Sequence, residues 1–298
     1  MEGSAVDAGV MTHRPDCLDA MLALLAEHGD DSKVVAGGTA FTILWRAGLI
    51  QAGHLMSCAG LHGLGDITDD EDCVGIGALA TFRAAETSAT VRSALPVLAA
   101  ALRQVANVRV RNVATWGGNA AEADNTSDLP CLLVALNAEI EIASLAGPRT
   151  VAAGDFFTDY FETVLTPEEF IVRIKVPRPP AGWTGSYVKF VSRSAEDRTC
   201  IGVAALVRVA DDGTCAGARV AATGVAPVPL RVPAAEQALA GTRLDQQVLD
   251  AFGHEYAAAA DPVSDIRGSA GYRKRVLPGL VSEALARAAA GGNEAVLR

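Results

Sequence analysis

The sequence predicts a mixed α/β (α+β) fold with two lobes followed by a smaller C-terminal α+β domain. In the first part, the apolar pair Val34–Val35 runs into a glycine turn, as a strand does when it leads into a helix. In the middle part, helical and strand-like spacings of apolar residues follow one another. Beyond the proline- and glycine-rich stretch 177–182, strand-like segments precede two long helical ones. The expected units are residues 1–60, 61–178 and 183–298.

The first lobe is expected to be a small βαβ-like unit. Asp16 can cap a helix whose apolar residues recur at helical spacing up to Leu25 and which ends near His28–Gly29. A strand is expected to follow from Lys33 to Ala36. The remaining expected elements of this lobe are a helix from Phe41 to Arg46 and a short strand at Leu55–Met56.

An acidic stretch and a glycine pattern follow. Residues 65–72 are acidic at five of eight positions, which indicates an exposed turn before a strand at Cys73–Ile76. The residues from Gly75 to Ala80 match the letters of the GxGxxA dinucleotide fingerprint. A true fingerprint needs a βαβ unit, whereas residues 84–105 have a helical pattern. We therefore do not assign a nicotinamide-binding Rossmann domain.

The rest of the chain alternates in the same way. One helix is expected to begin at Pro96, and three more are expected at 129–136, 244–260 and 269–289. The expected strands cover 138–144, 170–176, 185–190, 201–209 and 216–222, with a turn at 211–213 between the last two. Pro278–Gly279 is expected to break or kink the last helix.

Composition excludes several classes of function. The net charge is −10 and no basic stripe is visible, which argues against nucleic acid as a partner. No apolar run reaches the roughly 18 residues of a membrane helix. The chain does not start with a cationic and then apolar segment, so no secretory signal is predicted and a cytoplasmic location is expected.

The cysteines and histidines are scattered along the chain. The six cysteines form no CxxC pair and no cluster spacing, so they are predicted to be reduced and mostly buried. The five histidines show no ligand spacing either. The sequence predicts no metal site in this chain.

Two glycine-containing loops have the character of a diphosphate cradle. In the first, Ala36–Thr39, glycines follow an apolar strand, which would aim free amides at the mouth of the turn. In the second, Thr115, Gly117, Gly118 and Asn119 leave little side-chain bulk, so backbone N–H groups can approach an anion closely. Two such loops can grip one extended dinucleotide.

Taken in order, these loops and several other short segments resemble one family, the flavoprotein (medium) subunits of molybdenum hydroxylases such as aerobic carbon monoxide dehydrogenase and xanthine dehydrogenase. The segments that carry the resemblance are 36–39, Gly77–Ala78 with Thr81, 111–119, 127–130, and Lys189–Phe190 with Arg193. The resemblance implies a two-lobed FAD-binding domain of the p-cresol methylhydroxylase-like type and a C-terminal domain like that of carbon monoxide dehydrogenase flavoproteins. It further implies non-covalent FAD, a small [2Fe-2S] subunit and a large molybdopterin subunit, assembled as a dimer of heterotrimers.

The resemblance also assigns cofactor-binding positions. From the first lobe these are Val34, Val35, Ala36, Gly37, Gly38, Thr39 and Ala40. From the second lobe they are Ala78, Thr81, Ala114, Thr115, Gly117, Gly118, Asn119 and Glu122. Asp128 matches a position that holds a sugar hydroxyl, and Lys189 one near the isoalloxazine. The positions that match the lining of the flavin ring and the adenine end are Val105, Ala106 and Val172.

Each of these positions also has a purely structural interpretation. Asp128 can cap the helix that follows it, and Lys189 can be a surface lysine on an edge strand. Val105, Ala106 and Val172 can be ordinary core residues. The chain departs from the family pattern in three places. Ala40 and Phe41 follow Thr39 in place of a polar residue and a leucine, and Trp116 replaces an aliphatic residue. Glu122 places an acid where it would repel a diphosphate.

The expected function is an oxidoreductase subunit that carries electrons. Its chemistry would belong to the flavin, and the sequence contains no nucleophile–base pattern that would argue otherwise. Two alternatives are a stand-alone FAD-dependent oxidase or dehydrogenase and a flavin-free structural or assembly subunit. Neither the substrate of a holoenzyme nor the electron acceptor is named by the sequence.

Overall fold

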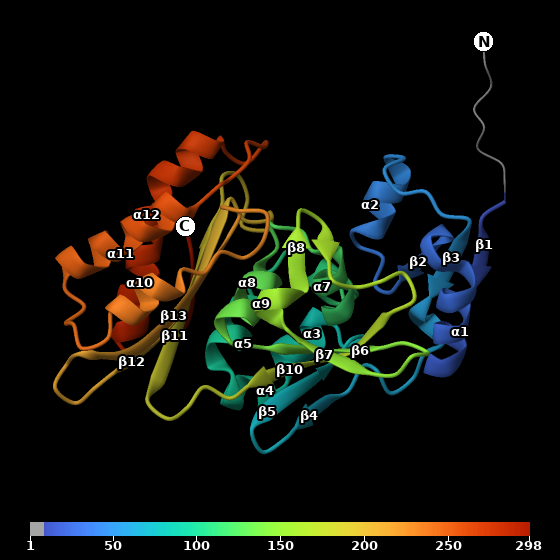
Figure 1. Ribbon diagram of the computed structural model, residues 1–298, viewed down its shortest axis with the longest axis horizontal. Helices are drawn as coiled ribbons and strands as arrows, with labels where there is room; N and C mark the ends of the chain where they lie inside the picture. The colour runs from blue at the N-terminus through green and yellow to red at the C-terminus, as the bar shows by residue number, and fades with distance from the viewer. Residues whose placement is uncertain (1–8) are drawn as a thin grey trace, which may run out of the picture.

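The computed structural model describes residues 9–298 and arranges them as three groups of elements side by side (Figure 1). The first residues, where no secretory signal is expected, lie in part outside this range. The N-terminal lobe lies at one end, a mixed lobe in the centre, and a sheet with long helices at the other end. None of the helices in the described part of the chain has the length and apolar character needed to cross a bilayer.

The N-terminal lobe is a small parallel α/β unit. Its elements are β1 (Met11–His13), α1 (Leu18–His28), β2 (Ser32–Val35), α2 (Phe41–Arg46) and β3 (His54–Ser57), with β3 between β1 and β2. Met21, Leu22 and Leu25 of α1 are buried against Met56 of β3. The expected elements are confirmed. The cap at Asp16 is wrong, because the N-cap position is Cys17 and no side chain closes this helix end.

The central lobe is built on an antiparallel sheet in the order β4-β5-β10-β6-β7. The strands are β4 (Ile67–Asp69), β5 (Cys73–Gly77), β6 (Glu139–Ala143), β7 (Arg149–Ala152) and β10 (Phe170–Pro177). The expectation that 65–72 is only a turn is wrong, because β4 pairs with β5 before the chain turns at Asp70. Strand β5 has antiparallel neighbours on both sides, so the GxGxxA letters do not open a parallel βαβ unit.

The glycines of that pattern have structural reasons. A Cβ atom at Gly77 would lie 2.3 Å from the carbonyl oxygen of Leu64, and one at Gly75 would collide with the guanidinium of Arg173. Both positions exclude a side chain because neighbouring protein atoms occupy the space.

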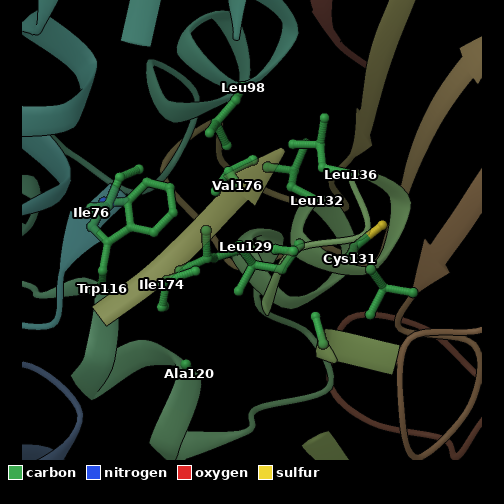
Figure 2. Packing of buried hydrophobic residues seen from close by; sticks show 14 of the residues in the cluster. Ile76, Leu98, Trp116, Ala120, Leu129, Cys131, Leu132, Leu136, Ile174 and Val176 are labelled. Atoms are coloured by element: carbon green, nitrogen blue, oxygen red, sulfur yellow. The ribbon is translucent and has the colours of Figure 1, made fainter. Parts of the chain in front are cut away.

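Helices pack against the central sheet and against the sheet of the C-terminal part. They are α3 (Phe82–Thr87), α4 (Ala89–Ala94), α5 (Pro96–Leu102), α6 (Val108–Arg111), α7 (Trp116–Glu122), α8 (Asp128–Ala135) and α9 (Ala153–Phe156), with a small hairpin of β8 (Phe157–Asp159) and β9 (Glu162–Thr163). The helical stretch 84–105 is divided into separate helices, because Ser88 caps a new helix and Pro96 begins another. The core of the central lobe contains Trp116, Ile76, Ile174 and Leu129 (Figure 2).

The C-terminal part is a four-stranded sheet with helices. Its elements are β11 (Trp183–Phe190), β12 (Ile201–Val209), β13 (Cys215–Thr223), β14 (Asn293–Leu297), α10 (Pro233–Ala238), α11 (Gln246–Ala259) and α12 (Ala270–Ala289). The three expected antiparallel strands are confirmed. Strand β14 was not predicted; it pairs in parallel with β11.

Pro278 does not break the last helix. Helix α12 continues from Ala270 to Ala289, and the backbone around Pro278 packs closely against α11. A Cβ atom at Gly253 of α11 would lie 2.5 Å from the Pro278 carbonyl oxygen, so this crossing needs a glycine. The expected break is wrong because tertiary packing outweighs the helix-breaking preference of one proline.

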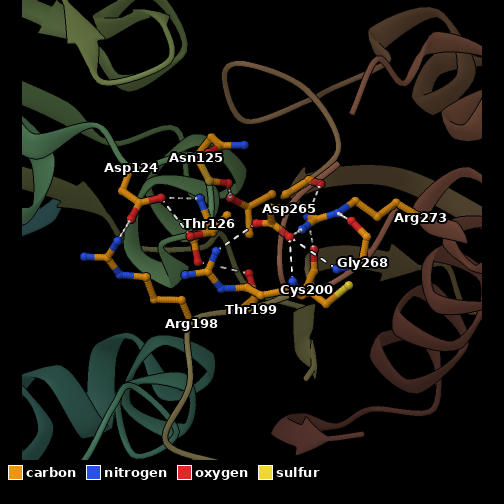
Figure 3. Close-up of polar contacts among 12 residues, drawn as sticks. Asp124, Asn125, Thr126, Arg198, Thr199, Cys200, Asp265, Gly268 and Arg273 are labelled. Atoms are coloured by element: carbon orange, nitrogen blue, oxygen red, sulfur yellow. Dashed lines mark hydrogen bonds and ion pairs between the residues drawn. The ribbon is translucent and has the colours of Figure 1, made fainter. Parts of the chain in front are cut away.

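A polar network joins the central lobe to the C-terminal part (Figure 3). Thr223 Oγ1 and Gly224 N donate to the Asn125 carbonyl at 2.6 and 2.8 Å. Arg273 is 1% exposed and donates at 2.6 Å to the carbonyls of Cys200 and Gly224 and at 2.5 Å to Asp265 Oδ1. The buried guanidinium therefore binds the turn after β13, the start of β12 and the loop before α12 together.

We expect Arg273→Leu to lower the free energy of unfolding by about 3–5 kcal/mol, because it leaves two buried carbonyls without their donor and removes one of the two cations that pair with Asp265. Urea unfolding followed by circular dichroism measures this loss. Lys274→Leu, at the exposed neighbouring position, is the matched control and should change stability by less than about 0.5 kcal/mol. Equal losses in the two variants would contradict the role assigned to the network.

Candidate functional site

The turn after β2 offers a row of unpaired backbone donors. Gly38 has φ +68°, a left-handed conformation that glycine adopts without strain, and Ala40 returns to the right-handed region. Among residues 9–298, the N–H groups of Gly37, Gly38, Thr39 and Ala40 have no acceptor, while the Gly38 and Ala40 carbonyls accept from α2. Successive free N–H groups in such a turn form a concave anion site.

The first loop touches the second loop, backbone against backbone. A Cβ atom at Gly37 would lie 1.9 Å from the carbonyl oxygen of Val113 and 3.0 Å from the Ala114 Cα. Nearby, a Cβ at Gly118 would lie 3.8 Å from the Ala36 Cβ. The two lobes therefore meet where side chains are smallest.

The second loop differs from the expectation in its amides. The N–H of Gly117 donates to the Ala78 carbonyl at 2.8 Å, and the N–H of Gly118 donates to Thr115 Oγ1 at 3.2 Å. Trp116 N donates to the Ala80 carbonyl in the same way. The expectation of exposed amides at Gly117 and Gly118 is wrong, because the Gly118 amide takes part in the cap of α7 and the Gly117 amide binds the segment that follows β5. What the second loop offers instead is a flat surface of small residues.

Two adjoining cavities lie on either side of this contact, of about 660 and about 380 Å³. Six residues line both: Lys33, Val34, Ala36, Ile50, Gly118 and Glu122. The smaller cavity is also lined by further predicted residues, namely Val35, Gly37, Gly38, Thr39, Ala40, Val105, Ala106, Ala114, Thr115, Asn119 and Asp128. The larger one is also lined by Ala78 and Gly117. Together they make a trough that passes between the lobes.

Three predicted residues do not line either cavity. Thr81 caps α3 by accepting from Ala84 N at 3.1 Å, and it pairs with Thr115 as an isolated β-bridge. Val172 lies at a register shift of β10, and its carbonyl accepts from Ala78 N at 3.0 Å. Lys189, the third, is completely buried. All three support lining residues from behind.

Lys189 and Asp128 form a buried ion pair. Lys189 Nζ lies 3.0 Å from Asp128 Oδ2, and Tyr187 Oη donates to Asp128 Oδ1 at 2.6 Å. The surface-lysine alternative is wrong, because β11 lies between β12 and β14 and the Lys189 side chain is 0% exposed. The helix-cap alternative for Asp128 is wrong as well: the N-cap is Ser127, and Asp128 is the first helical residue. Burial raises the pKa of the Asp128 carboxyl, while Lys189 and Tyr187 oppose that rise.

The same lysine holds the loop that lines the smaller cavity. Lys189 Nζ donates to the Gln104 carbonyl at 2.8 Å, and Arg111 Nη1 donates to the carbonyls of Val105 and Ala106 at 2.8 and 2.9 Å. Ala106 has φ +44°, a conformation that costs free energy in a non-glycine residue. Two cations, Lys189 and Arg111, therefore hold a strained loop in place. Val105 and Ala106 are thus more than the ordinary core residues that the structural interpretation considered.

Glu122 lies where the two cavities join. Burial raises the pKa of its carboxyl, and the charges of Arg198 and Lys33 oppose this rise. Arg198 also pairs with the buried carboxylate of Asp124. Because two cations face this region, the acid does not leave it uniformly negative, which reduces the repulsion expected from the sequence.

Comparison with known proteins identifies the family of the chain. Residues 7–179 match the family model of the FAD binding domain in molybdopterin dehydrogenase, and residues 186–288 match that of the CO dehydrogenase flavoprotein C-terminal domain. The chain belongs to the FAD-binding medium subunits of the molybdenum hydroxylase family. It is therefore an oxidoreductase subunit with FAD as its cofactor.

Individual relatives of this medium subunit match over nearly their whole length. The carbon monoxide dehydrogenase medium chain of Afipia carboxidovorans is 32% identical over 278 residues, covering 93% of this chain and 96% of the relative. The alpha subunit of the 6-hydroxypseudooxynicotine dehydrogenase complex of Paenarthrobacter nicotinovorans is 32% identical over 273 residues, covering 92% of each chain. The reconstituted CO dehydrogenase from Oligotropha carboxidovorans superposes with a TM-score of 0.92 at 31% identity, covering 96% of this chain and 100% of that one.

Sequence reasoning missed the three cations that line the medium subunit's trough, Lys33, Arg198 and Arg267, as well as Ser127. Ser127 hydrogen-bonds with the side chain of Asn119 at 2.8 Å and so fixes a predicted residue. Single charged residues in loops and at strand ends carry no periodic signal, so only the fold reveals that they converge.

We expect Lys189→Met to destabilise the medium subunit by about 3–5 kcal/mol near neutral pH, because Asp128 would stay buried without its cation. A buried carboxyl with a raised pKa contributes stability that is lost as pH rises through that pKa. Removing Lys189 raises the pKa further, so the loss should be larger at pH 8 than at pH 5.

Urea unfolding at the two pH values measures the difference. Lys175→Met, which breaks the partly exposed pair with Glu141, is the control and should cost less than about 1 kcal/mol at both. A pH-independent loss in Lys189→Met would argue against an ionised Asp128 in the pair.

Proposed function

We propose that FAD lies in the trough between two lobes formed by residues 1–60 and 61–178, with 183–298 as a supporting C-terminal domain. The observation that carries this assignment is the row of four free N–H groups at Gly37–Ala40, facing the small-residue loop of the other lobe. A diphosphate needs several convergent donors and close backbone approach, and both features meet at this contact.

The residues of the two loops would then have different roles. The first loop would bind the diphosphate through its amides and the Thr39 hydroxyl, and Ala40 would contribute its N–H rather than a side chain. The second loop would contribute the close surface of Ala114, Gly118 and Asn119 and the Thr115 hydroxyl, which is free to donate because its oxygen only accepts from Gly118. Lys33 and Arg198 would favour an anion at this place.

Asp128 and Lys189 would act from behind the lining. Both Asp128 oxygens already have partners, so a sugar hydroxyl would share a carboxylate that Lys189 and Tyr187 hold in place. Lys189 would influence the flavin through the loop 104–106 and through its charge, and not by direct contact. This arrangement differs from a lysine placed beside the isoalloxazine.

The proposed role of the subunit is electron transfer within a complex. Bound FAD would supply the redox chemistry, which takes electrons from a donor and passes them to an acceptor. We propose a small [2Fe-2S] subunit as the donor, a large molybdopterin subunit as the site of substrate oxidation, and an external acceptor, in a dimer of heterotrimers. The relatives carry names such as medium chain and complex subunit, which supports a multi-subunit setting.

The cysteine side chains of this chain support a role without covalent catalysis. Four of the six thiols are buried and none is in a disulfide, as the sequence predicts. Burial raises the pKa of Cys58 and of Cys131 to about 12, so neither supplies a thiolate near neutral pH. The chemistry is therefore assigned to the cofactor.

The test of this function begins with the purified chain. Its absorbance spectrum, with identification of any flavin released by heat, should show about one FAD per chain. Reduction of that FAD by the co-purified iron–sulfur subunit, and not by small substrates alone, would support the electron-transfer role. Turnover of a small substrate by the isolated chain would support the stand-alone enzyme instead, and failure to bind added FAD in the full complex would contradict the site.

We expect Gly38→Asp to weaken FAD binding at least about tenfold more than Gly38→Asn. Both side chains tolerate the left-handed conformation, and the nearest side-chain atom to a new Cβ would be 3.7 Å away, so the pair differs mainly in charge. Fluorescence titration of the flavin-free proteins with FAD measures both affinities. Equal affinities would show that the diphosphate does not lie at this turn.

A further inference from the structure

Three histidines that are far apart in the sequence meet in the N-terminal lobe. His13 lies on β1, His28 is the last residue of α1, and His54 begins β3. One ring nitrogen from each lies within 4.8 Å of the other two, and His13 Nε2 is 2.8 Å from His54 Nδ1. The rings of His28 and His54 stack with centroids 3.7 Å apart. The sequence interpretation of scattered histidines is therefore wrong for these three.

Strand register explains why they converge. In the parallel sheet His13 pairs with Met56 and His54 pairs with Met11, so the two histidines lie on the same face, one diagonal step apart. Met56 on that face is buried against α1, and the helix ends at His28 beside the same strands. The core packing of the lobe thus delivers all three imidazoles to one point.

These imidazoles have few other partners. Among residues 9–298, the one hydrogen bond of the three rings is the contact between His13 and His54, and no carboxylate or carbonyl fixes them. All three rings are half-buried. A cluster of neutral imidazoles, each with a free nitrogen, is a typical donor set for zinc and related divalent metals.

We propose that His13, His28 and His54 form a zinc-type metal site with a fourth position open to water. Zn–N bonds of about 2.0–2.1 Å in a tetrahedral site separate the ligand nitrogens by roughly 3.4 Å. To reach this geometry, the stacked rings of His28 and His54 have to rotate out of their nearly parallel arrangement, because the metal must lie close to the plane of each ring. The C-terminal end of α1 also favours a cation through its partial negative charge.

We assign the site a structural role, because it lies away from the glycine turn. Its neighbour Ser32 lines the larger cavity. Strand β2 starts at Ser32, which pairs with His54, and ends at Val35, just before the glycine turn. The histidines are thus at the opposite end of the strands from Gly37 and Gly38. A bound metal would cross-link β1, α1 and β3 and stabilise the lobe without touching the flavin.

The experiment uses the metal-stripped protein and Zn²⁺ in isothermal titration calorimetry. Wild type should bind one equivalent, and His28→Gln should bind at least about tenfold more weakly. His62→Gln, at an exposed histidine outside the cluster, is the matched control and should bind like wild type. FAD content should be unchanged in both variants, which separates this proposal from the flavin site.

Co²⁺ gives a second measurement that does not depend on a variant. Its binding to stripped wild type should produce the visible bands of tetrahedral coordination with nitrogen ligands, and Zn²⁺ should abolish them. Binding without those bands, or equal Zn²⁺ affinity in wild type and His28→Gln, would overturn the proposal. So would the absence of a rise in the thermal midpoint of wild type when Zn²⁺ is added.

Discussion

The contact between the Gly37 backbone and the Val113 carbonyl is the constraint on which the site depends. It leaves no room for a Cβ atom, so the two lobes can approach only through a glycine. Because the chain is pulled close here, the free amides of the first loop face the second loop, and the trough opens on both sides. The second loop has no free amides at 116–118, since these N–H groups bind the segment after β5 and the Thr115 hydroxyl.

Behind this contact, buried charged side chains hold the lining of the smaller cavity in place. Lys189 and Arg111 each bind carbonyls of the loop 104–106, and Lys189 also pairs with Asp128. Burying a single charge of this kind costs desolvation free energy, and the fold tolerates these charges because each has several partners. The same logic holds at the junction with the C-terminal part, where Arg273 serves two carbonyls and one carboxylate.

Local patterns predicted much of the fold. The helix at 41–46, the strand at 201–209 and the glycine loops follow from spacing and turn chemistry that neighbouring residues determine. The misses have long-range causes. Strand β14 forms by pairing with the open edge of β11. Pro278 stays helical because α11 packs on it. The two glycine loops differ because the N–H groups at 116–118 of the second loop have acceptors and those at 37–40 of the first loop have none among residues 9–298. Likewise, the candidate site could be located from residue types, but the pairing of Lys189 with Asp128 could not, because it depends on distant strands meeting.

Strand β14 has a consequence for the order of events during synthesis. Arg298 N donates to the Lys189 carbonyl at 2.7 Å, and Lys189 itself pairs with Leu297, so the strand that carries the buried lysine gains its second neighbour from residues more than a hundred positions later. Non-local pairing of this kind forms late. While the chain is growing on the ribosome, the two glycine loops can already be present, yet β11 still has an open edge. The trough between the lobes should therefore take its final form only after nearly the whole of residues 9–298 has been made.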